Sequence, residues 1–285
     1  MLVELEAVGY TYLPRSEAAA QALANVSFTV RAGEFIALIG PTGSGKSTLV
    51  QIMAGLVKPT SGRVIFEGED IWLEPGRLPV RRRLVGLIFQ EPEKQLFEMT
   101  VEDDVAFWPR NAGIGAEAVP EMVRAALEAV GLDYASYKER SPFTLSGGEM
   151  RRAAIAGVLV MGSRVLILDE PAVGLDARGR VDLADKIRAL NQTGTTIVMV
   201  SHDMDEVAEL ADRVIMLAQG CVVFDGQPRE AFKQTELLAG IGLEAPQVAR
   251  IAARLDRHGL LSGRLPLTPA ELEQDILAAF GKATA

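Results

Sequence analysis

The sequence has few cysteines, few histidines and no long apolar run. Its 285 residues include one cysteine, Cys221, and two histidines. A single cysteine excludes a disulfide framework and a cysteine-based zinc site, and it is typical of a reducing compartment. The longest apolar run, residues 153–162, contains ten residues, whereas a membrane-spanning helix needs about 20. We therefore expect neither a disulfide-stabilised domain nor a membrane span.

Positive charge is also scarce. The chain has 29 lysines and arginines against 38 aspartates and glutamates, so its formal net charge is −9 at pH 7. This balance argues against a general DNA- or RNA-binding surface, and we expect no nucleic-acid partner. Residues 1–6 lack the positively charged segment of a signal peptide, so we expect none. The hydrophobic content of 48% suffices for a full-sized core.

The most informative stretch is a glycine-rich loop at residues 40–48. It matches the P-loop pattern G-x-x-x-x-G-K-[ST] over its full length. The apolar run 35–39 precedes it, and residues 49–54 resemble the first turns of a helix. Strand, glycine loop and helix in this order predict a nucleoside triphosphate site. We assign the whole motif to nucleotide binding: Gly40, Pro41, Thr42, Gly43, Ser44, Gly45, Lys46, Ser47 and Thr48.

The residue types of this loop suit phosphate chemistry. Glycines let backbone N–H groups point inward, and the following helix adds its partly positive N-terminus. Lys46 supplies a mobile positive charge for the β- and γ-phosphates, and the Ser47 hydroxyl is a hard oxygen ligand for Mg²⁺. Upstream, the ring of Tyr12 could stack on the base. The alternative for Tyr12, packing at a strand end, is equally open.

Two acids follow a second apolar run. Residues 165–168 predict a strand buried on both faces, and Asp169 and Glu170 come directly after it. Asp169 can hold Mg²⁺ through water, as the acidic partner of Ser47. Glu170 is placed to orient or deprotonate the attacking water. Acids that start a helix are the ordinary alternative, but the P-loop upstream favours the catalytic interpretation.

Gln90 and His202 also lie at predicted strand ends. Gln90 follows residues 84–89, and its amide could hold the metal or the attacking water. His202 lies at the end of the β-branched, buried strand expected at 195–200, where open α/β sheets place ligands, and it could sense or stabilise the γ-phosphate. A loop glutamine and a structural histidine are the alternatives. We take Gln90, Glu170 and His202 as candidate catalytic residues, and Ser47, Gln90 and Asp169 as candidate metal ligands.

A second anion site is predicted at residues 145–149, Leu-Ser-Gly-Gly-Glu. A helix begins directly after this segment, so Ser146, Gly147 and Gly148 present a helix N-terminus. The apolar run at 153–161 predicts that this helix is buried.

The remaining pattern predicts an α/β fold. Residues 25–31 alternate between apolar and polar side chains, as in an antiparallel sheet that is wet on one face. Four arginines at positions 77, 81, 82 and 83 are interpreted as a solvated helix face. Further elements are expected as strands at 2–8, 213–217 and 221–224, and as helices at 117–130, 228–235, 246–257 and 269–280. The last helix carries a predicted capping box formed by Thr268 and Glu271.

Residues 90–105 form an acidic stretch with apolar residues between the charges. Six acids stand against one lysine, interleaved with leucine, phenylalanine, methionine and valine. A solvated surface is the usual interpretation. The alternative is a docking surface for a basic, partly apolar partner helix.

The order of these motifs resembles ABC-type ATPase subunits over about residues 2–235. The motifs are the P-loop, Gln90, Leu-Ser-Gly-Gly-Glu, the Asp169–Glu170 pair, Gly-Leu-Asp at 174–176, and His202. The resemblance implies that two chains sandwich two ATP molecules head to tail. Ser146, Gly147, Gly148 and Glu149 would then contact ATP on the partner chain, and Asp176 would lie at the dimer seam. The spacing of the motifs alone does not choose between a site within one chain and a site shared by two.

A narrower resemblance is to the ATPase component of energy-coupling factor (ECF) transporters. It rests on Phe-Gln-x-Pro-Glu-x-Gln-Leu-Phe at 89–97, on Thr-Val-x-x-Asp-Val-Ala-Phe at 100–107, and on the helical tail. The resemblance implies a transmembrane T component, whose arginine-bearing coupling helices would dock near residues 91–107. A substrate-binding S component would take part indirectly, and the chain would lie at the cytoplasmic face of the membrane.

Together these patterns predict a P-loop ABC ATPase core with an antiparallel β subdomain. We expect a nucleotide-binding domain at 1–235, an inserted helical subdomain at 91–145 and a C-terminal helical extension at 236–285 that could dimerise. The expected function is ATP hydrolysis that drives an importer of vitamins or transition-metal ions, with ATP and Mg²⁺ bound. The alternatives are the ATPase of another ABC transporter class and a soluble, non-transport ABC ATPase.

Overall fold

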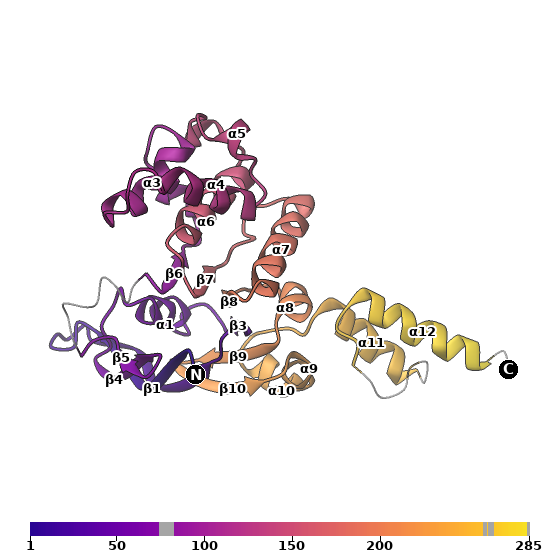
Figure 1. Ribbon diagram of the computed structural model, residues 1–285. Helices are drawn as coiled ribbons and strands as arrows, with labels where there is room; N and C mark the ends of the chain where they lie inside the picture. Colours follow the sequence, from indigo (N-terminus) through magenta and orange to yellow (C-terminus); the bar gives the residue numbers. More distant parts are fainter. Residues whose placement is uncertain (74–82, 259–260, 262–264, 284–285) are drawn as a thin grey trace.

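The computed structural model describes residues 1–73, 83–258, 261 and 265–283 (Figure 1). It contains two sheets, a helical region inserted between strands of the larger sheet, and a C-terminal helical extension. The arginines at positions 77, 81 and 82, interpreted from the sequence as a solvated helix face, lie outside the described residues.

The larger sheet carries the strands that end at the candidate functional residues. Its six strands lie in the order β10-β9-β3-β8-β7-β6, and only β10 runs antiparallel to its neighbour. Because the other five are parallel, their carboxyl ends meet at one edge of the sheet. The strands are β3 (Phe35–Ile39), β6 (Val85–Ile88), β7 (Val165–Asp169), β8 (Thr196–Val200), β9 (Arg213–Ala218) and β10 (Cys221–Gly226).

The smaller sheet is antiparallel, in the order β2-β1-β4-β5. Val26, Phe28 and Val30 are buried and Ser27 between them is exposed, as the alternation in the sequence predicts. An apolar core joins this sheet to one face of the larger sheet and to helix α1. The elements are β1 (Val3–Tyr12), β2 (Ala20–Val30), β4 (Ser61–Phe66), β5 (Glu69–Asp70) and α1 (Lys46–Met53).

The helical region lies between β6 and β7 in the chain and stands apart from the smaller sheet (Figure 1). Its helices pack on a second apolar core at the other face of the larger sheet. Residues 153–156 and 160 are buried, as the apolar run predicts, but residues 157–159 and 161 are only half-buried. The elements are η2 (Pro92–Gln95), α3 (Val101–Asn111), α4 (Val119–Ala129), α5 (Tyr134–Tyr137), η3 (Pro142–Thr144) and α6 (Gly147–Leu159).

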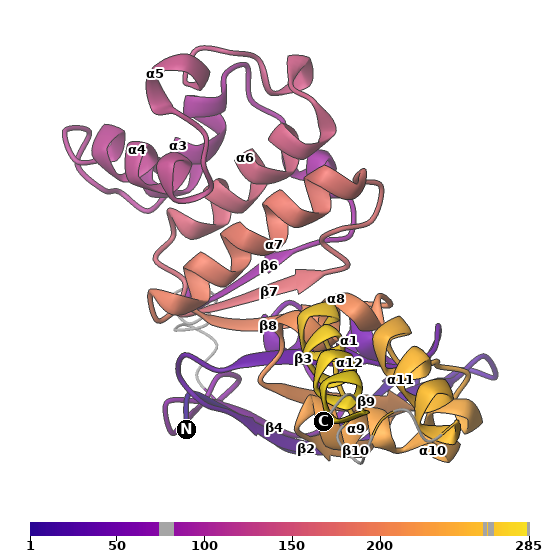
Figure 2. The same ribbon diagram turned by 90° about the vertical axis from the view of Figure 1, so that its right-hand side faces the viewer.

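The C-terminal helices have a small core of their own, formed by Val248, Ala252 and Leu272. They project from the molecule beside α8, which α11 contacts (Figures 1 and 2). Thr268 Oγ1 accepts a bond from Glu271 N, but the Glu271 carboxylate binds Leu267 N and Arg229, so only half of the expected capping box forms. The remaining helices are α7 (Ala177–Gln192), α8 (Met204–Leu210), α9 (Pro228–Lys233), α10 (Thr235–Gly240), α11 (Gln247–Arg257) and α12 (Pro269–Ala283).

Within the described residues, no helix combines the length and the apolar character needed to cross a membrane.

Candidate functional site

The glycine loop joins the end of β3 to the start of α1. Gly45 is the N-cap of α1 and has a φ of 103°. A Cβ at Gly45 would lie 2.5 Å from the carbonyl oxygen of Ala22, so both the conformation and the space require glycine. At Gly43, with a φ of 79°, a Cβ would meet nothing within 4 Å, so the loop is open on this side. The N-terminus of α1 is therefore accessible to an anion.

Lys46 is buried within this loop. Its Nζ donates hydrogen bonds to the carbonyl oxygens of Gly40 at 2.7 Å and Pro41 at 2.9 Å. Burial lowers the pKa of the Lys46 ammonium, and the charges of Glu170 and Asp169 act in the opposite direction. The positive charge thus lies inside the loop, where phosphate groups would be stronger acceptors than the two carbonyls.

A pocket of about 570 Å³ opens over the loop and brings together residues from distant parts of the chain. Tyr12, which is 45% exposed, lines this pocket. The Tyr12 hydroxyl lies 2.9 Å from Thr48 Oγ1, and the ring meets Tyr10 edge to face at 4.8 Å. The predicted residues that line the pocket are Tyr12, Thr42, Gly43, Gly45, Lys46, Ser47, Thr48, Gln90, Glu170 and His202.

Three candidate catalytic side chains are in direct contact at the edge of the larger sheet. His202 Nε2 lies 2.7 Å from Glu170 Oε1, and Gln90 Nε2 donates to Glu170 Oε2 at 3.0 Å. Glu170 has a φ of 53°, a left-handed conformation that non-glycine residues rarely adopt. Its backbone N–H donates to Val200 O on the neighbouring strand, which holds the residue in place. Strained backbone of this kind is common at functional sites.

Asp169 and Ser47 offer hard oxygen ligands beside this group. Burial, and to a smaller extent the charge of Glu170, raises the pKa of Asp169, while the charge of Lys46 and the Ser47 hydroxyl act in the opposite direction. A cation would relieve this unfavourable burial of negative charge. Among the described residues, no cluster of three or more His, Cys, Asp or Glu side chains could hold a metal. The hydroxyl of Ser47 and the carboxylate of Asp169 are oxygen ligands of the kind that Mg²⁺ takes, together with phosphate oxygens and water.

The segment 145–149 begins helix α6 but does not line the P-loop pocket. Ser146 Oγ accepts from Glu149 N at 3.3 Å, and Glu149 Oε2 accepts from Ser146 N at 2.7 Å, which completes a capping box. Tyr137 donates to Glu149 Oε1 at 2.6 Å. These hydrogen bonds lower the pKa of Glu149 to about 2, and the bond from Tyr137 has a larger effect than those from Ser146. A Cβ at Gly147 would meet nothing within 4 Å, so this helix N-terminus is open.

Asp176 is likewise outside the pocket and acts as the N-cap of α7, where its Oδ1 accepts from Gly179 N at 2.7 Å. One chain therefore holds two separate parts of the predicted site. The P-loop, Gln90, Glu170 and His202 meet at one place, and the residues at 146–149 and 176 lie elsewhere on the surface of the same chain.

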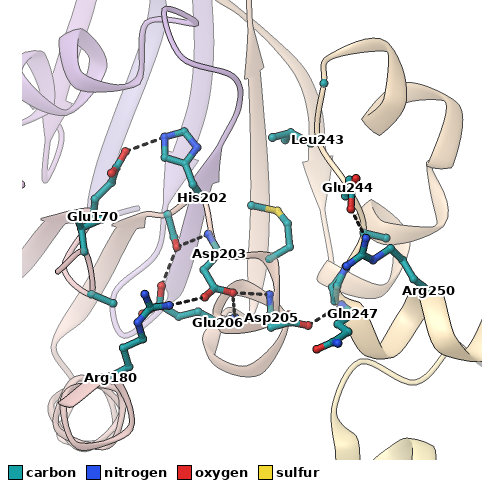
Figure 3. Close-up of a pocket in the computed structure, with 17 residues that line it drawn as sticks. Glu170, Arg180, His202, Asp203, Asp205, Glu206, Leu243, Glu244, Gln247 and Arg250 are labelled. Atoms are coloured by element: carbon teal, nitrogen blue, oxygen red, sulfur yellow. Dashed lines mark hydrogen bonds and ion pairs between the residues drawn. The ribbon is translucent and has the colours of Figure 1, made fainter. Parts of the chain in front are cut away.

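A second pocket, of about 630 Å³, is drawn in Figure 3. Glu170 and His202 line this pocket as well as the P-loop pocket. Residues at the start of α8, residues 242–247 and Arg250 form much of its wall. Gln247 N donates to Asp205 Oδ1 at 2.7 Å, so the extension contacts the helix that follows His202. The sequence patterns did not single out Arg180 and Asp203, which also line this pocket and are joined at 3.4 Å.

Several acids of the stretch 90–105 are occupied within the fold. Asp104 Oδ2 accepts from the backbone N–H groups of Phe97 at 2.8 Å and Glu98 at 2.9 Å. Glu102 accepts from the Tyr134 hydroxyl, and Asp103 accepts from the Thr100 hydroxyl and from Arg110. These carboxylates shape the start of α3, so they contribute less to a free charged surface than the sequence suggests.

The exposed part of this stretch is mainly apolar. Phe97 is 57% exposed, Met99 80% and Phe107 44%, and the rings of Phe97 and Phe107 meet edge to face at 4.8 Å. We call Phe97, Met99 and Phe107 the apolar patch. Phe97 and Phe107 contact each other, Met99 lies two positions after Phe97 in the chain, and exposed apolar side chains that gather in this way are typical of interaction sites.

Known proteins share the sequence pattern and the fold of this chain. Residues 23–173 match the family model described as ABC transporter. The chain belongs to the ABC transporter family. It is 48% identical over 260 residues to the energy-coupling factor transporter ATP-binding protein EcfA2 of Clostridium perfringens, covering 91% of each chain. It is 50% identical over 259 residues to the EcfA2 protein of Symbiobacterium thermophilum, covering 91% of this chain and 90% of that protein.

Solved ABC cassettes have the same fold. The structure of cbiO1 from Clostridium perfringens, described as part of the ABC transporter complex cbiONQ, is 33% identical with a TM-score of 0.76, over 90% of this chain and 98% of that one. The dimeric cassette MJ0796, solved in a post-hydrolysis state with ADP and Pi, is 29% identical with a TM-score of 0.70, over 80% of this chain and 99% of that one. The predicted ABC ATPase fold is confirmed.

Proposed function

We propose that this chain is the ATP-binding and ATP-hydrolysing subunit that energises an ECF importer of vitamins or transition-metal ions. The observation that carries the proposal is the divided site. The P-loop pocket contains Gln90, Glu170 and His202 in contact, but it lacks the second helix N-terminus, which begins at Ser146. A second subunit placed head to tail would supply that N-terminus to each pocket.

ATP lies over the P-loop in this proposal. Its phosphates displace the Gly40 and Pro41 carbonyls from Lys46 and meet the N-terminus of α1. The exposed ring of Tyr12 is available to the base. On the partner chain, the N-terminus of α6 contacts the γ-phosphate, and Asp176 lies at the seam between the chains.

Gln90, Glu170 and His202, the three side chains in contact, position and activate the water molecule that attacks the γ-phosphate. Glu170 accepts its proton or orients it, since both carboxylate oxygens already lie in a network with His202 and Gln90. His202 contacts the γ-phosphate and holds Glu170 in position. Ser47, Asp169 and the Gln90 amide oxygen would hold Mg²⁺, which when bound neutralises charge on the phosphate oxygens.

Closure and opening of the dimer follow from this arrangement. ATP makes its full set of contacts only when both chains meet, so ATP favours the closed dimer. Hydrolysis removes the γ-phosphate that joins the chains, and the dimer opens. The partner can be an identical or a paralogous chain, because both half-sites are intact in this sequence.

A transmembrane T component docks near residues 91–107 and receives this motion, and a substrate-binding S component takes part through it. The apolar patch provides the contact area, and the half-buried Glu98, between Phe97 and Met99 in the chain, attracts basic side chains. The chain then works at the cytoplasmic face of the membrane. EcfA2 proteins 41–50% identical to this chain support this class over another ABC transporter class or a soluble ABC ATPase.

The divided site can be tested by mixing two inactive variants. Lys46→Ala removes from the P-loop the positive charge that would bind the phosphates of ATP. Gly147→Asp adds a carboxylate at the open start of α6, where a Cβ meets nothing within 4 Å and an acid favours the helix dipole. This variant should fold but repel the phosphate of a partner chain. Each variant alone should hydrolyse ATP slowly.

A mixture of the two variants should regain phosphate release, because a mixed dimer contains one site with an intact P-loop and an intact helix N-terminus. Mixed wild-type and Lys46→Ala chains provide the matched control for subunit exchange. If mixing restores no activity although the chains exchange, the proposal of a site shared between two chains is wrong.

A further inference from the structure

Two arginines from different helices hold the segment between Glu170 and Asp176. Arg151 of α6 donates from Nη1 to the carbonyl oxygens of Pro171 and Val173, the latter at 2.8 Å. Arg180 of α7 donates from Nε to the carbonyl oxygen of Leu175 at 3.2 Å. Carbonyl groups of three alternate residues therefore accept from two guanidinium groups, one at each end of the segment.

Arg180 continues from this segment to the residue after His202. Its Nη1 lies 3.4 Å from Asp203 Oδ2 (Figure 3). The other Asp203 oxygen accepts from Asp205 N at 3.0 Å and Glu206 N at 3.2 Å, so Asp203 caps helix α8. Arg180 thus joins the segment before Asp176 to the backbone that carries His202.

Arg151 makes the corresponding connection to the start of α6. Arg151 is only 5% exposed, so the charge of its guanidinium lies inside the protein, where it requires strong hydrogen-bond acceptors. The planar guanidinium presents several donors in a fixed arrangement and can bind two carbonyl groups at once. A shift of α6, which begins at the proposed partner-ATP site, is therefore transmitted to Pro171, directly after Glu170.

We propose that Arg151 and Arg180 are positioning residues that set Glu170 and His202 for hydrolysis according to the position of α6 and of residues 174–176. Neither arginine lines the P-loop pocket, so neither contacts ATP bound there. Closure by a partner chain presses on α6 and on 174–176, and the two arginines carry that displacement to the 2.7 Å contact between Glu170 and His202. This inference rests on the proposed ATPase function.

The test compares Arg180→Ala with Arg188→Ala. Arg188 lies two turns further along α7 and also joins α7 to α8, because its Nη2 lies 2.9 Å from Glu209 Oε1. Both substitutions remove a partly exposed ion pair between the same helices. Arg180→Ala should lower kcat about tenfold, since small misplacements of catalytic groups have large effects on rate. The affinity of the chain for ATP should change less than about twofold. Arg188→Ala should leave both quantities at the wild-type value.

Conservative variants separate positioning from folding. Arg180→Lys should restore only part of the lost rate, because an ammonium is a point donor and cannot reach both Leu175 and Asp203 in the same geometry. Arg151→Lys should reduce kcat with ATP affinity retained. A wild-type kcat for Arg180→Ala, or equal losses in kcat and ATP affinity in both Arg180 variants, would overturn the inference. If the wild-type chain released no phosphate from ATP, the proposed ATPase function itself would be wrong. The positioning role is tested separately, by the ratio of the kcat of each variant to the kcat of the wild type.

Discussion

Replacing Glu170 by glutamine should separate ATP binding from ATP hydrolysis. Glutamine has the shape of glutamate and the same backbone requirements at a φ of 53°. Its amide oxygen can keep the 2.7 Å contact with His202. Its NH₂ group replaces the oxygen that accepts from Gln90 at 3.0 Å, and the Gln90 amide can rotate to present its own oxygen. The variant should therefore fold and bind ATP like the wild type.

The rate should fall because an amide cannot take a proton from water. A positioned general base contributes about 10²- to 10⁴-fold, which corresponds to an increase of about 3–5 kcal/mol in the activation free energy. Phosphate release measures this loss, and size-exclusion chromatography with ATP should show a trapped dimer. Glu209→Gln on α8 is the matched control, because it removes a carboxylate that pairs with Arg188 away from the pocket. Turnover of Glu170→Gln at the wild-type rate would refute the role assigned to Glu170.

Two further predictions concern the partner surface and the start of α6. The double variant Phe97→Ala, Met99→Ala should lose most of its co-purification with a transmembrane partner in mild detergent and keep its ATPase rate, because exposed apolar side chains supply binding energy at an interface. Replacing Val181, another exposed apolar residue, by alanine is the control. Unchanged co-purification of the double variant would contradict the docking site. The folded state depresses the pKa of Glu149 to about 2, so this carboxylate stabilises the fold above the unfolded pKa of 4.5, and the stability is lost as the pH falls toward 2. Glu149→Gln should lower the free energy of urea unfolding at pH 7 by about 1 kcal/mol, after discounting for solvent screening. The gap should narrow below about pH 4.5; a gap independent of pH would show that the charge of Glu149 is not the cause.

Many residues of the candidate site could be predicted from the sequence because they belong to short, continuous motifs. The P-loop is one continuous segment, and glycine at position 45 is required by a backbone conformation that the motif itself encodes. Apolar runs predicted the buried strands, and a polar residue after such a run predicted the position of Gln90, Glu170 and His202. The acidic stretch was only partly readable. Its composition suggested a charged surface, but Asp104 turns inward to the backbone of Phe97 and Glu98.

The sequence by itself determined the segments and the chemistry available in each one. The tertiary structure decided which of them meet. Gln90 and Glu170 are 80 positions apart, and they touch because β7 lies beside β6 in the sheet, a pairing that no local periodicity contains. The N-terminus of α6, which belongs to the helical region between β6 and β7, does not line the P-loop pocket. The tertiary structure also places Arg180 between Leu175 and Asp203. Local sequence sets the backbone period and the side-chain types, whereas contacts across the chain depend on the packing of many residues at once.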